Sequence, residues 1–301
     1  MKKHPVILGF LLLAIVGVLF FLVLRMLVFF GEKNQDFSFK DKDKIGVVTI
    51  EGVLSNSRDT LKQLDKYEKD GKVKAVVLRI NSPGGAVVPS QEIYDKVLRL
   101  KKSKKVVVSM GSVAASGGYY IACAADRIIA NPGTITGSVG VIAQFSQIED
   151  LLEKVGLKTT VVKTGRYKDV GSPVREMTTA DQGLVQGVID DIQGQFMEAV
   201  LSNRNLSKEN IEDIADARIF TGRQALKAGL VDDLGNMEYA IDIATDLAGI
   251  EGKPEVIYPE KKRKSLLRYI ASETISAISE EFRGVGVGTG IGYLYKPARG
   301  M

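Results

Sequence analysis

The residues best suited to chemistry lie in two glycine-containing turns that follow predicted apolar strands. One is Asn81–Gly85 (NSPGG) and the other is Gly111–Tyr120 (GSVAASGGYY). In a parallel sheet, the crevice beyond the carboxyl ends of the strands is the usual ligand site. Paired glycines let a backbone approach a ligand closely, and a helix N-terminus favours an oxyanion. Ser116, which opens a predicted helix of small residues, is therefore a candidate nucleophile whose oxyanion these turns could bind.

The composition excludes most other forms of hydrolytic catalysis. The 301-residue chain has one histidine, His4, and one cysteine, Cys123. Ser-His-Asp and Cys-His catalysis are therefore excluded, as is nearly every zinc enzyme. A serine nucleophile would need another base, and a lysine can serve where its site keeps it neutral. Among 41 lysines and arginines, spacing alone selects no base. We interpret Cys123, in an apolar helix, as a core residue.

Both turns also have a purely structural interpretation. Gly84 and Gly85, after Pro83, could form only a tight turn, and Ser116 could be only a helix N-cap, since serine is a favoured cap residue. Neither turn carries the G-x-S-x-G elbow, which would in any case require a histidine. The residues alone therefore indicate a possible Ser/Lys hydrolase and leave the structural interpretation open.

The elements that must position these turns alternate between strand and helix. Apolar runs predict strands over 45–50, 73–80, 105–110, 127–130, 139–145 and 159–163. Helical spacing predicts helices over 57–69, 90–102, 114–125, 147–155, 179–203, 207–215, 222–228 and 237–248. Repeated strand-then-helix units indicate an α/β fold with a largely parallel sheet.

The N-terminal segment is typical of a membrane span. Residues 6–24 carry no charge and are long enough for the roughly 30 Å hydrocarbon core. The run is longer than the apolar region of a secretory signal, and no A-x-A cleavage site follows it, so we expect a retained anchor over 1–30 rather than a cleaved signal. Residues 31–44 are polar and would form a linker. Lysines and arginines on both sides of the span leave its orientation open.

The C-terminal residues 251–301 are predicted as an extension. The basic run at 261–264 could contact anionic lipid or begin a solvated helix. Alternate glycines in 284–301 suit a mobile tail. They do not form a phosphate loop, because no strand-turn-helix pattern and no following Lys-Ser/Thr accompany them.

Five stretches resemble the signal peptide peptidase A family in its short, single-anchor bacterial form. They are 45–52 (IGVVTIEG), 76–85 (VVLRINSPGG), 109–142, 162–178 (VKTGRYKDVGSPVREMT) and 221–241, of which the block 109–142 is the most specific. The resemblance implies an α/β fold of repeated ββα units, similar to Clp protease and crotonase, with a helical C-terminal part and one preceding transmembrane helix. The peptidase domain would cover 45–250.

The same resemblance implies a Ser/Lys dyad. Ser116 in AASGGYY would be the nucleophile, and Lys168 in GRYKD would be the general base. Lys163 and Arg166 are the nearby alternatives for the base.

The resemblance also implies the oxyanion donors. They would be the amide of Gly117 and an amide of the PGG turn, with Gly84 preferred to Gly85. These positions agree with the two glycine turns identified above. No metal and no other cofactor is implied.

The substrates, location and assembly follow from the resemblance as well. It implies an endopeptidase that degrades signal peptides and other hydrophobic peptides. The peptidase domain would lie on the extracytoplasmic side of a bacterial inner or plasma membrane, held by the N-terminal helix. The subunits would form a homo-oligomeric ring, and it stays open whether Ser116 and Lys168 come from one copy or from neighbouring copies. Nucleic acid is not an expected partner.

Two other functions remain open at this stage. A crotonase-type acyl-thioester hydratase or isomerase would share the oxyanion-binding glycine turns, but it would not explain the anchor or the SGGYY and GRYKD pair. A membrane-anchored scaffold without catalytic activity would keep the same fold.

Overall fold

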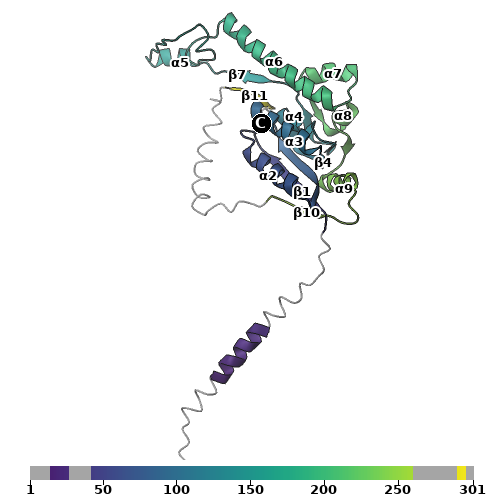
Figure 1. The fold of residues 1–301 in the computed structure, drawn as a ribbon. Coiled ribbons are helices and arrows are strands. Elements are labelled where there is room, and N and C mark those ends of the chain that lie inside the picture. Colours follow the sequence, from purple (N-terminus) through teal and green to yellow (C-terminus); the bar gives the residue numbers. More distant parts are fainter. Residues whose placement is uncertain (1–13, 27–41, 260–289, 296–301) are drawn as a thin grey trace, which may run out of the picture. The chain divides into compact units, whose positions relative to one another are not determined.

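A computed structural model describes residues 14–26, 42–259 and 290–295 (Figure 1). The chain forms two compact units, Met1–Lys42 and Asp43–Met301. In the first unit, residues 14–26 are helical. Within the described ranges, no helix is both long enough and apolar enough to cross a membrane. The predicted span over 6–24 lies partly outside those ranges, and the basic run at 261–264 lies wholly outside them.

A mostly parallel sheet forms the centre of the second unit. In order across the sheet, its main strands are β10 (Glu255–Ile257), β1 (Lys44–Glu51), β2 (Val73–Ser82), β4 (Lys105–Ala115), β5 (Arg127–Ala130) and β9 (Asp233–Leu234). Each neighbouring pair in this order is parallel. The predicted α/β class with a largely parallel sheet is therefore confirmed.

Helices cover both faces of this sheet. On one face lie α2 (Arg58–Lys69), α3 (Val87–Leu100) and α4 (Gly117–Ala122), and on the other lies α9 (Met237–Leu247). Val76 and Val108 pack toward the first face, whereas Val77 and Val107 pack with Ala244 of α9. This alternation follows from the pleat of the strands. Because both faces are buried, the strands read as nearly continuous apolar runs.

The strand that precedes Ser116 is longer than the sequence predicted. We expected a strand over 105–110 followed by a glycine turn, but β4 continues to Ala115. The extra residues pair with β6 (Ile135–Gly137), and Ala114 pairs with Ser82 of β2. Hydrogen-bonding partners on both sides thus keep the chain extended through Gly111. The predicted helix over 114–125 is correspondingly shorter, at Gly117–Ala122.

A second, three-stranded sheet lies beside the first. Its strands are β3 (Gly84–Ala86), β11 (Gly290–Leu294) and β7 (Ile142–Gln144), with β11 in the middle and antiparallel to both neighbours. The prediction of a mobile glycine-rich tail was therefore wrong for residues 290–294. Both β3 and β11 have glycines where their backbones approach closely. A Cβ added to Gly292 of β11 would lie only 2.9 Å from the carbonyl oxygen of Gly85 in β3.

The remaining helices are α5 (Glu149–Lys154), α6 (Thr179–Asn203), α7 (Lys208–Ala215) and α8 (Gly222–Lys227), and β8 (Ile219–Thr221) pairs with β6.

Residues 145–178, which we call the arm, connect β7 to α6. Figure 1 shows the arm, with α5, at the N-terminal end of α6 and away from the main sheet. The predicted strand over 159–163 is absent, because this exposed stretch of the arm pairs with no strand of the described chain.

Candidate active site

Ser116 joins β4 to α4 in a strained backbone conformation. Its φ of 53° and ψ of −119° are values that residues other than glycine rarely adopt. The residue is buried, and its amide donates to the Gly137 carbonyl at 2.8 Å. Although Ser116 occupies the N-cap position of α4, its hydroxyl makes no capping hydrogen bond. Its Oγ lies 3.4 Å from the Gly140 carbonyl oxygen instead. Strain of this kind clusters at functional sites.

The structure brings the two predicted glycine turns together next to Ser116. A Cβ added to Gly84, whose φ is +93°, would lie 2.6 Å from the Gly117 amide nitrogen. A Cβ added to Gly117 would lie 3.3 Å from the Gly85 amide nitrogen. Only glycines permit backbones to approach this closely. The two predicted turns therefore lie against each other at the backbone level.

The two amides of the PGG turn differ in their partners. The Gly84 amide donates to Ser82 Oγ at 3.1 Å, and that hydroxyl in turn donates to the Gly52 carbonyl at 2.6 Å. The family resemblance favours Gly84 over Gly85 as an oxyanion donor. In this structure the Gly84 N–H is engaged by a side chain, and Gly85 pairs with Tyr293 of β11.

The segment β11 lies along the PGG turn. Tyr293 pairs with Gly85, and the Tyr295 amide donates to the Pro83 carbonyl at 2.7 Å. The carbonyl oxygen of Tyr293 lies so close to Gly84 that an added Cβ would overlap it. The chain's own C-terminal residues thus occupy the edge of β3 beside the nucleophile.

The side chain of Tyr293 fills an aromatic pocket. Its ring is fully buried, with centroids 5.3 Å from that of Tyr120 and 4.8 Å from that of Phe196. Tyr94 completes the cluster, 4.9 Å from Tyr120. Burial raises the pKa of Tyr120 to about 12, so the pocket is uncharged over the whole physiological range.

Lys168 lies apart from Ser116. It is exposed in a turn of the arm that the Val170 amide closes by donating to the Tyr167 carbonyl at 3.1 Å. In the described parts of the chain, no hydrogen bond or ion pair joins Lys168 to the nucleophile. The two alternative bases are also in the arm, where Lys163 contacts the carboxylate of Asp169 and the Arg166 guanidinium lies 5.2 Å from the Tyr167 ring centroid.

Cys123 has the environment of a core residue. It is fully buried just beyond α4, and its thiol donates to the Tyr120 carbonyl at 3.1 Å. Burial raises the pKa of the thiol to about 12, so a nucleophilic thiolate does not form near neutral pH. Among residues 14–26, 42–259 and 290–295, no cluster of His, Cys, Asp or Glu is suited to hold a metal ion.

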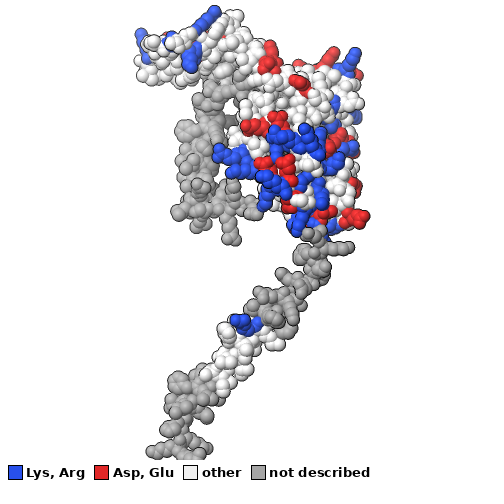
Figure 2. All heavy atoms as spheres, in the orientation of Figure 1, with Lys and Arg blue, Asp and Glu red and all other residues white. Residues whose placement is uncertain are grey.

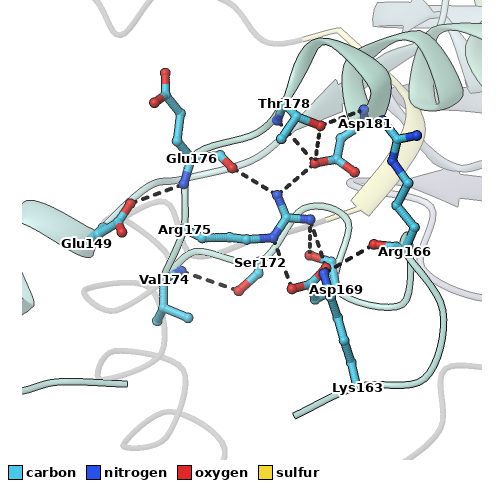
Figure 3. Close-up of polar contacts among 10 residues, drawn as sticks. All are labelled: Glu149, Lys163, Arg166, Asp169, Ser172, Val174, Arg175, Glu176, Thr178 and Asp181. Carbon is cyan, nitrogen blue, oxygen red and sulfur yellow. Dashed lines mark hydrogen bonds and ion pairs between the residues drawn. The ribbon is translucent and has the colours of Figure 1, made fainter. Parts of the chain in front are cut away.

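Two features of the site region were not predicted from the sequence. One is β11 with Tyr293, which its glycine-rich context concealed. The other is a charged cluster around Arg175 (Figure 3), which includes Asp169, the residue that follows Lys168. A partial signal for this cluster was present, because Thr178-x-x-Asp181 before an apolar helix is a capping pattern.

Comparison with known proteins places most of the second unit in protease families. Residues 99–251 match the model described as Peptidase family S49, and residues 43–136 match that described as Clp protease. A Synechocystis protein named "Putative protease" is 46% identical over 216 residues, which cover 71% of this chain and 78% of that protein.

Two further relatives carry more specific names. An Enterococcus faecium protein named "Putative signal peptide peptidase SppA" is 37% identical over 188 residues, 62% of this chain and 55% of that protein. "Protease 4" of Haemophilus influenzae is 36% identical over 221 residues, which cover 68% of this chain and 35% of that protein.

Proposed function

Because the chain belongs to peptidase family S49, the signal peptide peptidase A family, we propose that this serine protease uses Ser116 as its nucleophile and Lys168 as its general base. The observation that carries the proposal is the strained, buried Ser116 beside two converging glycine turns. A scaffold without activity would have no need for this strain. A crotonase-type hydratase would need the glycine turns but not the serine between them.

The oxyanion of the tetrahedral intermediate would be bound by backbone amides. We assign this role to Gly117 and to an amide of the PGG turn, Gly84 or Gly85, because the backbones of this turn and of Gly117 lie against each other. Gly84 supplies the positive φ that turns the backbone at this point. Donors held in place before the reaction stabilise developing charge without reorganisation.

The proposed reaction has two steps, and in each of them Lys168 carries a proton from the nucleophile to the leaving group. First, Ser116 Oγ attacks the peptide carbonyl carbon while its proton passes to the neutral amine of Lys168. The C–N bond then breaks, and the protonated lysine returns the proton to the departing amine. Second, Lys168 takes a proton from water as the water oxygen attacks the acyl-enzyme carbonyl. The C–O bond to Ser116 then breaks, and the protonated lysine returns that proton to Ser116 Oγ, which releases the carboxylic acid product and regenerates the enzyme.

Among the candidate bases, Lys168 has the most suitable surroundings. The ammonium of Lys163 is paired with the Asp169 carboxylate and donates to the Arg166 carbonyl at 3.1 Å. An ammonium held by a carboxylate is stabilised in its charged form and is a poor proton acceptor. Arginine is protonated at all physiological pH values. Lys168 is therefore the base we propose.

We further propose that the dyad forms between neighbouring copies of the chain. Ser116 is buried in the body, whereas Lys168 is exposed on the arm. The arm exposes several large apolar side chains, namely Leu151, Val155, Leu157, Val161, Val162 and Tyr167. Figure 2 shows that the visible face of the arm is mostly uncharged, with scattered Lys and Arg. Such surfaces are typical of protein contacts, and a homo-oligomeric ring would bury them.

The substrates we propose are signal peptides and other hydrophobic peptides in extended conformation. The support comes from β11, which is held antiparallel between β3 and β7. An added strand of this kind is one of the common modes of peptide recognition. The aromatic pocket that holds Tyr293 would accept a large apolar side chain of the substrate once β11 has left.

The N-terminal residues would attach this peptidase to a bacterial inner or plasma membrane. The support is the uncharged run over 6–24, which is long enough to span a bilayer. The peptidase domain would lie on the extracytoplasmic side, as the family resemblance implies, where cleaved signal peptides remain in the membrane.

Hydrolysis assays test the proposal. The full chain in detergent would be given a hydrophobic fluorogenic peptide, alongside Ser116→Ala and Lys168→Ala. Ser202→Ala and Lys158→Ala, at exposed positions on α6 and the arm, are matched controls. Loss of hydrolysis in the first pair and full activity in the second is the expected result. Equal rates in all five proteins would refute the dyad.

A further inference from the structure

The arm that carries Lys168 has no apolar core of its own. From Val141 to Ala180 no side chain is buried, and α5 contributes none. A segment with few buried apolar contacts opens at low cost in free energy unless polar contacts hold it. A general base must nevertheless be held close to its productive geometry, because small displacements reduce rates strongly.

Asp169 is the residue through which the turn of Lys168 is held. It follows Lys168 directly, and its carbonyl accepts a hydrogen bond from the Ser172 amide at 3.0 Å. Its side-chain carboxylate, which is only 12% exposed, binds Arg175 in a bidentate manner (Figure 3). Arg175 Nε donates to Oδ2 at 3.0 Å, and Nη2 donates to Oδ1 at 2.8 Å. A guanidinium fork of this kind fixes orientation as well as distance.

The same guanidinium reaches the first turn of α6. Arg175 Nη1 donates to Asp181 Oδ2 at 2.7 Å. Asp181 is itself fixed in a capping box, because its carboxylate accepts from the Thr178 amide at 3.1 Å while its own amide donates to Thr178 Oγ at 3.2 Å. Since α6 is anchored in the core by Phe196, Arg175 links the exposed turn to a rigid element.

The other charged groups of this cluster are also engaged. Lys163 also binds Oδ1 of the Asp169 carboxylate, and Glu149 accepts a hydrogen bond from the Glu176 amide at 3.1 Å. Arg175 and Lys163 together hold the pKa of Asp169 well below its usual range. The carboxylate next to Lys168 is thus committed to two cations, and no ion pair of Lys168 occurs among the described residues.

We infer that Arg175 is a positioning residue for the general base, tying the Lys168 turn to α6 through Asp169 and Asp181. The inference rests on the proposed function, since it takes Lys168 as the base. The new element is that Arg175, seven residues from Lys168 in the sequence, determines the position of the base. A lysine at this position could not reproduce the role, because an ammonium lacks the planar fork that binds both carboxylates at once.

Steady-state kinetics of the full chain in detergent test this inference, with a hydrophobic fluorogenic peptide as substrate. We expect Arg175→Gln to lower kcat about 100-fold while KM stays within about twofold, because the base is displaced and the peptide groove is not. Arg175→Lys should recover only part of the loss. The matched control is Arg127→Gln, which breaks an Arg–Asp ion pair between β5 and β9 and should retain the wild-type kcat.

Hydrogen exchange separates positioning from a general loss of structure. In Arg175→Gln, peptides covering 163–172 should exchange faster, while peptides of β2 and β4 keep their protection. A wild-type kcat in Arg175→Gln, or faster exchange throughout the sheet that accounts for the lost activity, would overturn the inference. Lys168→Ala separates failure of the positioning role from failure of the dyad. If Lys168→Ala is inactive while Arg175→Gln is fully active, the positioning role of Arg175 is refuted and the dyad stands. If Lys168→Ala is fully active, the dyad itself is refuted.

Discussion

The carbonyl oxygen of Tyr293 lies so close to the α-carbon of Gly84 that a side chain at position 84 would overlap it. The same added Cβ would lie 2.6 Å from the amide nitrogen of Gly117, the residue that follows the candidate nucleophile. Because position 84 is a glycine, strand β11 and the backbone next to Ser116 can both approach this turn closely.

Substitution of Gly84 should therefore abolish activity. In Gly84→Ala, the methyl group would meet two backbone groups, and the φ of +93° would be strained for alanine. We expect kcat/KM to fall by about 100-fold or more, because the turn that carries the oxyanion donors must shift. Gly133→Ala is the matched control, since an added Cβ there meets no atom within 4 Å. Wild-type hydrolysis by Gly84→Ala would show that the PGG turn has no catalytic role.

Release of β11 should raise activity. Removing a fully buried aromatic side chain costs about 3–5 kcal/mol, so Tyr293→Ala should weaken the attachment of β11 to the groove. We expect kcat/KM for a hydrophobic peptide to rise about tenfold or more, since a larger fraction of the protein has an open groove. Tyr258→Ala, which removes an exposed tyrosine, is the control and should leave kcat/KM unchanged. An unaltered or lower kcat/KM in Tyr293→Ala would mean that β11 does not compete with substrate.

Mixing two inactive chains tests whether the dyad is shared between copies. Ser116→Ala and Lys168→Ala chains would be dissociated together and reassembled at equal ratio. If neighbouring subunits supply the two residues, roughly a quarter of the sites regain both, and activity returns to about that fraction. The double variant, mixed with wild type in the same way, controls for assembly. Absence of recovery in confirmed mixed assemblies would place both residues in one chain.

The order of the arm should be insensitive to pH except in strong acid. Arg175 lowers the pKa of Asp181 to about 2 and holds that of Asp169 below its usual range. A carboxyl with a depressed pKa stabilises the folded state above its unfolded pKa of about 3.9, and this stability is lost as the pH falls through the folded value. Hydrogen exchange of 163–178, corrected for intrinsic rates, should stay constant above about pH 5 and accelerate below about pH 3. Loosening of the arm between pH 5 and 7 would contradict this.

The parts of the fold that sequence predicted are those dictated by periodicity and strand order. Parallel strands end at one edge of a sheet, so two glycine turns that each follow a buried strand had to meet there. Helix α6 was predicted at its observed ends from its helical spacing, and the structure adds that Thr178 and Asp181 cap its N-terminus.

The parts that sequence missed depend on partners distant in the chain. Val161 and Val162 have high β-propensity, yet neither pairs with a strand in the described parts of the chain, and Val162 is 95% exposed. The glycines near 290 suggested mobility, but β3 and β7 provide edges on which such a segment can pair. The role of Arg175 could not be predicted from its neighbours in the sequence. Its two carboxylate partners lie on either side of it, and many other acidic residues were equally plausible partners.

Covalent labelling of the nucleophile is the sharpest test of the Ser116–Lys168 dyad. A fluorophosphonate probe, which reacts with activated serines, would be added to wild type and Lys168→Ala, and the adduct would be located by peptide mass spectrometry. We predict a single adduct on Ser116 in the wild type and a labelling rate at least about 100-fold lower in Lys168→Ala. An adduct on another residue, or equal labelling rates in the two proteins, would contradict the Ser116–Lys168 dyad.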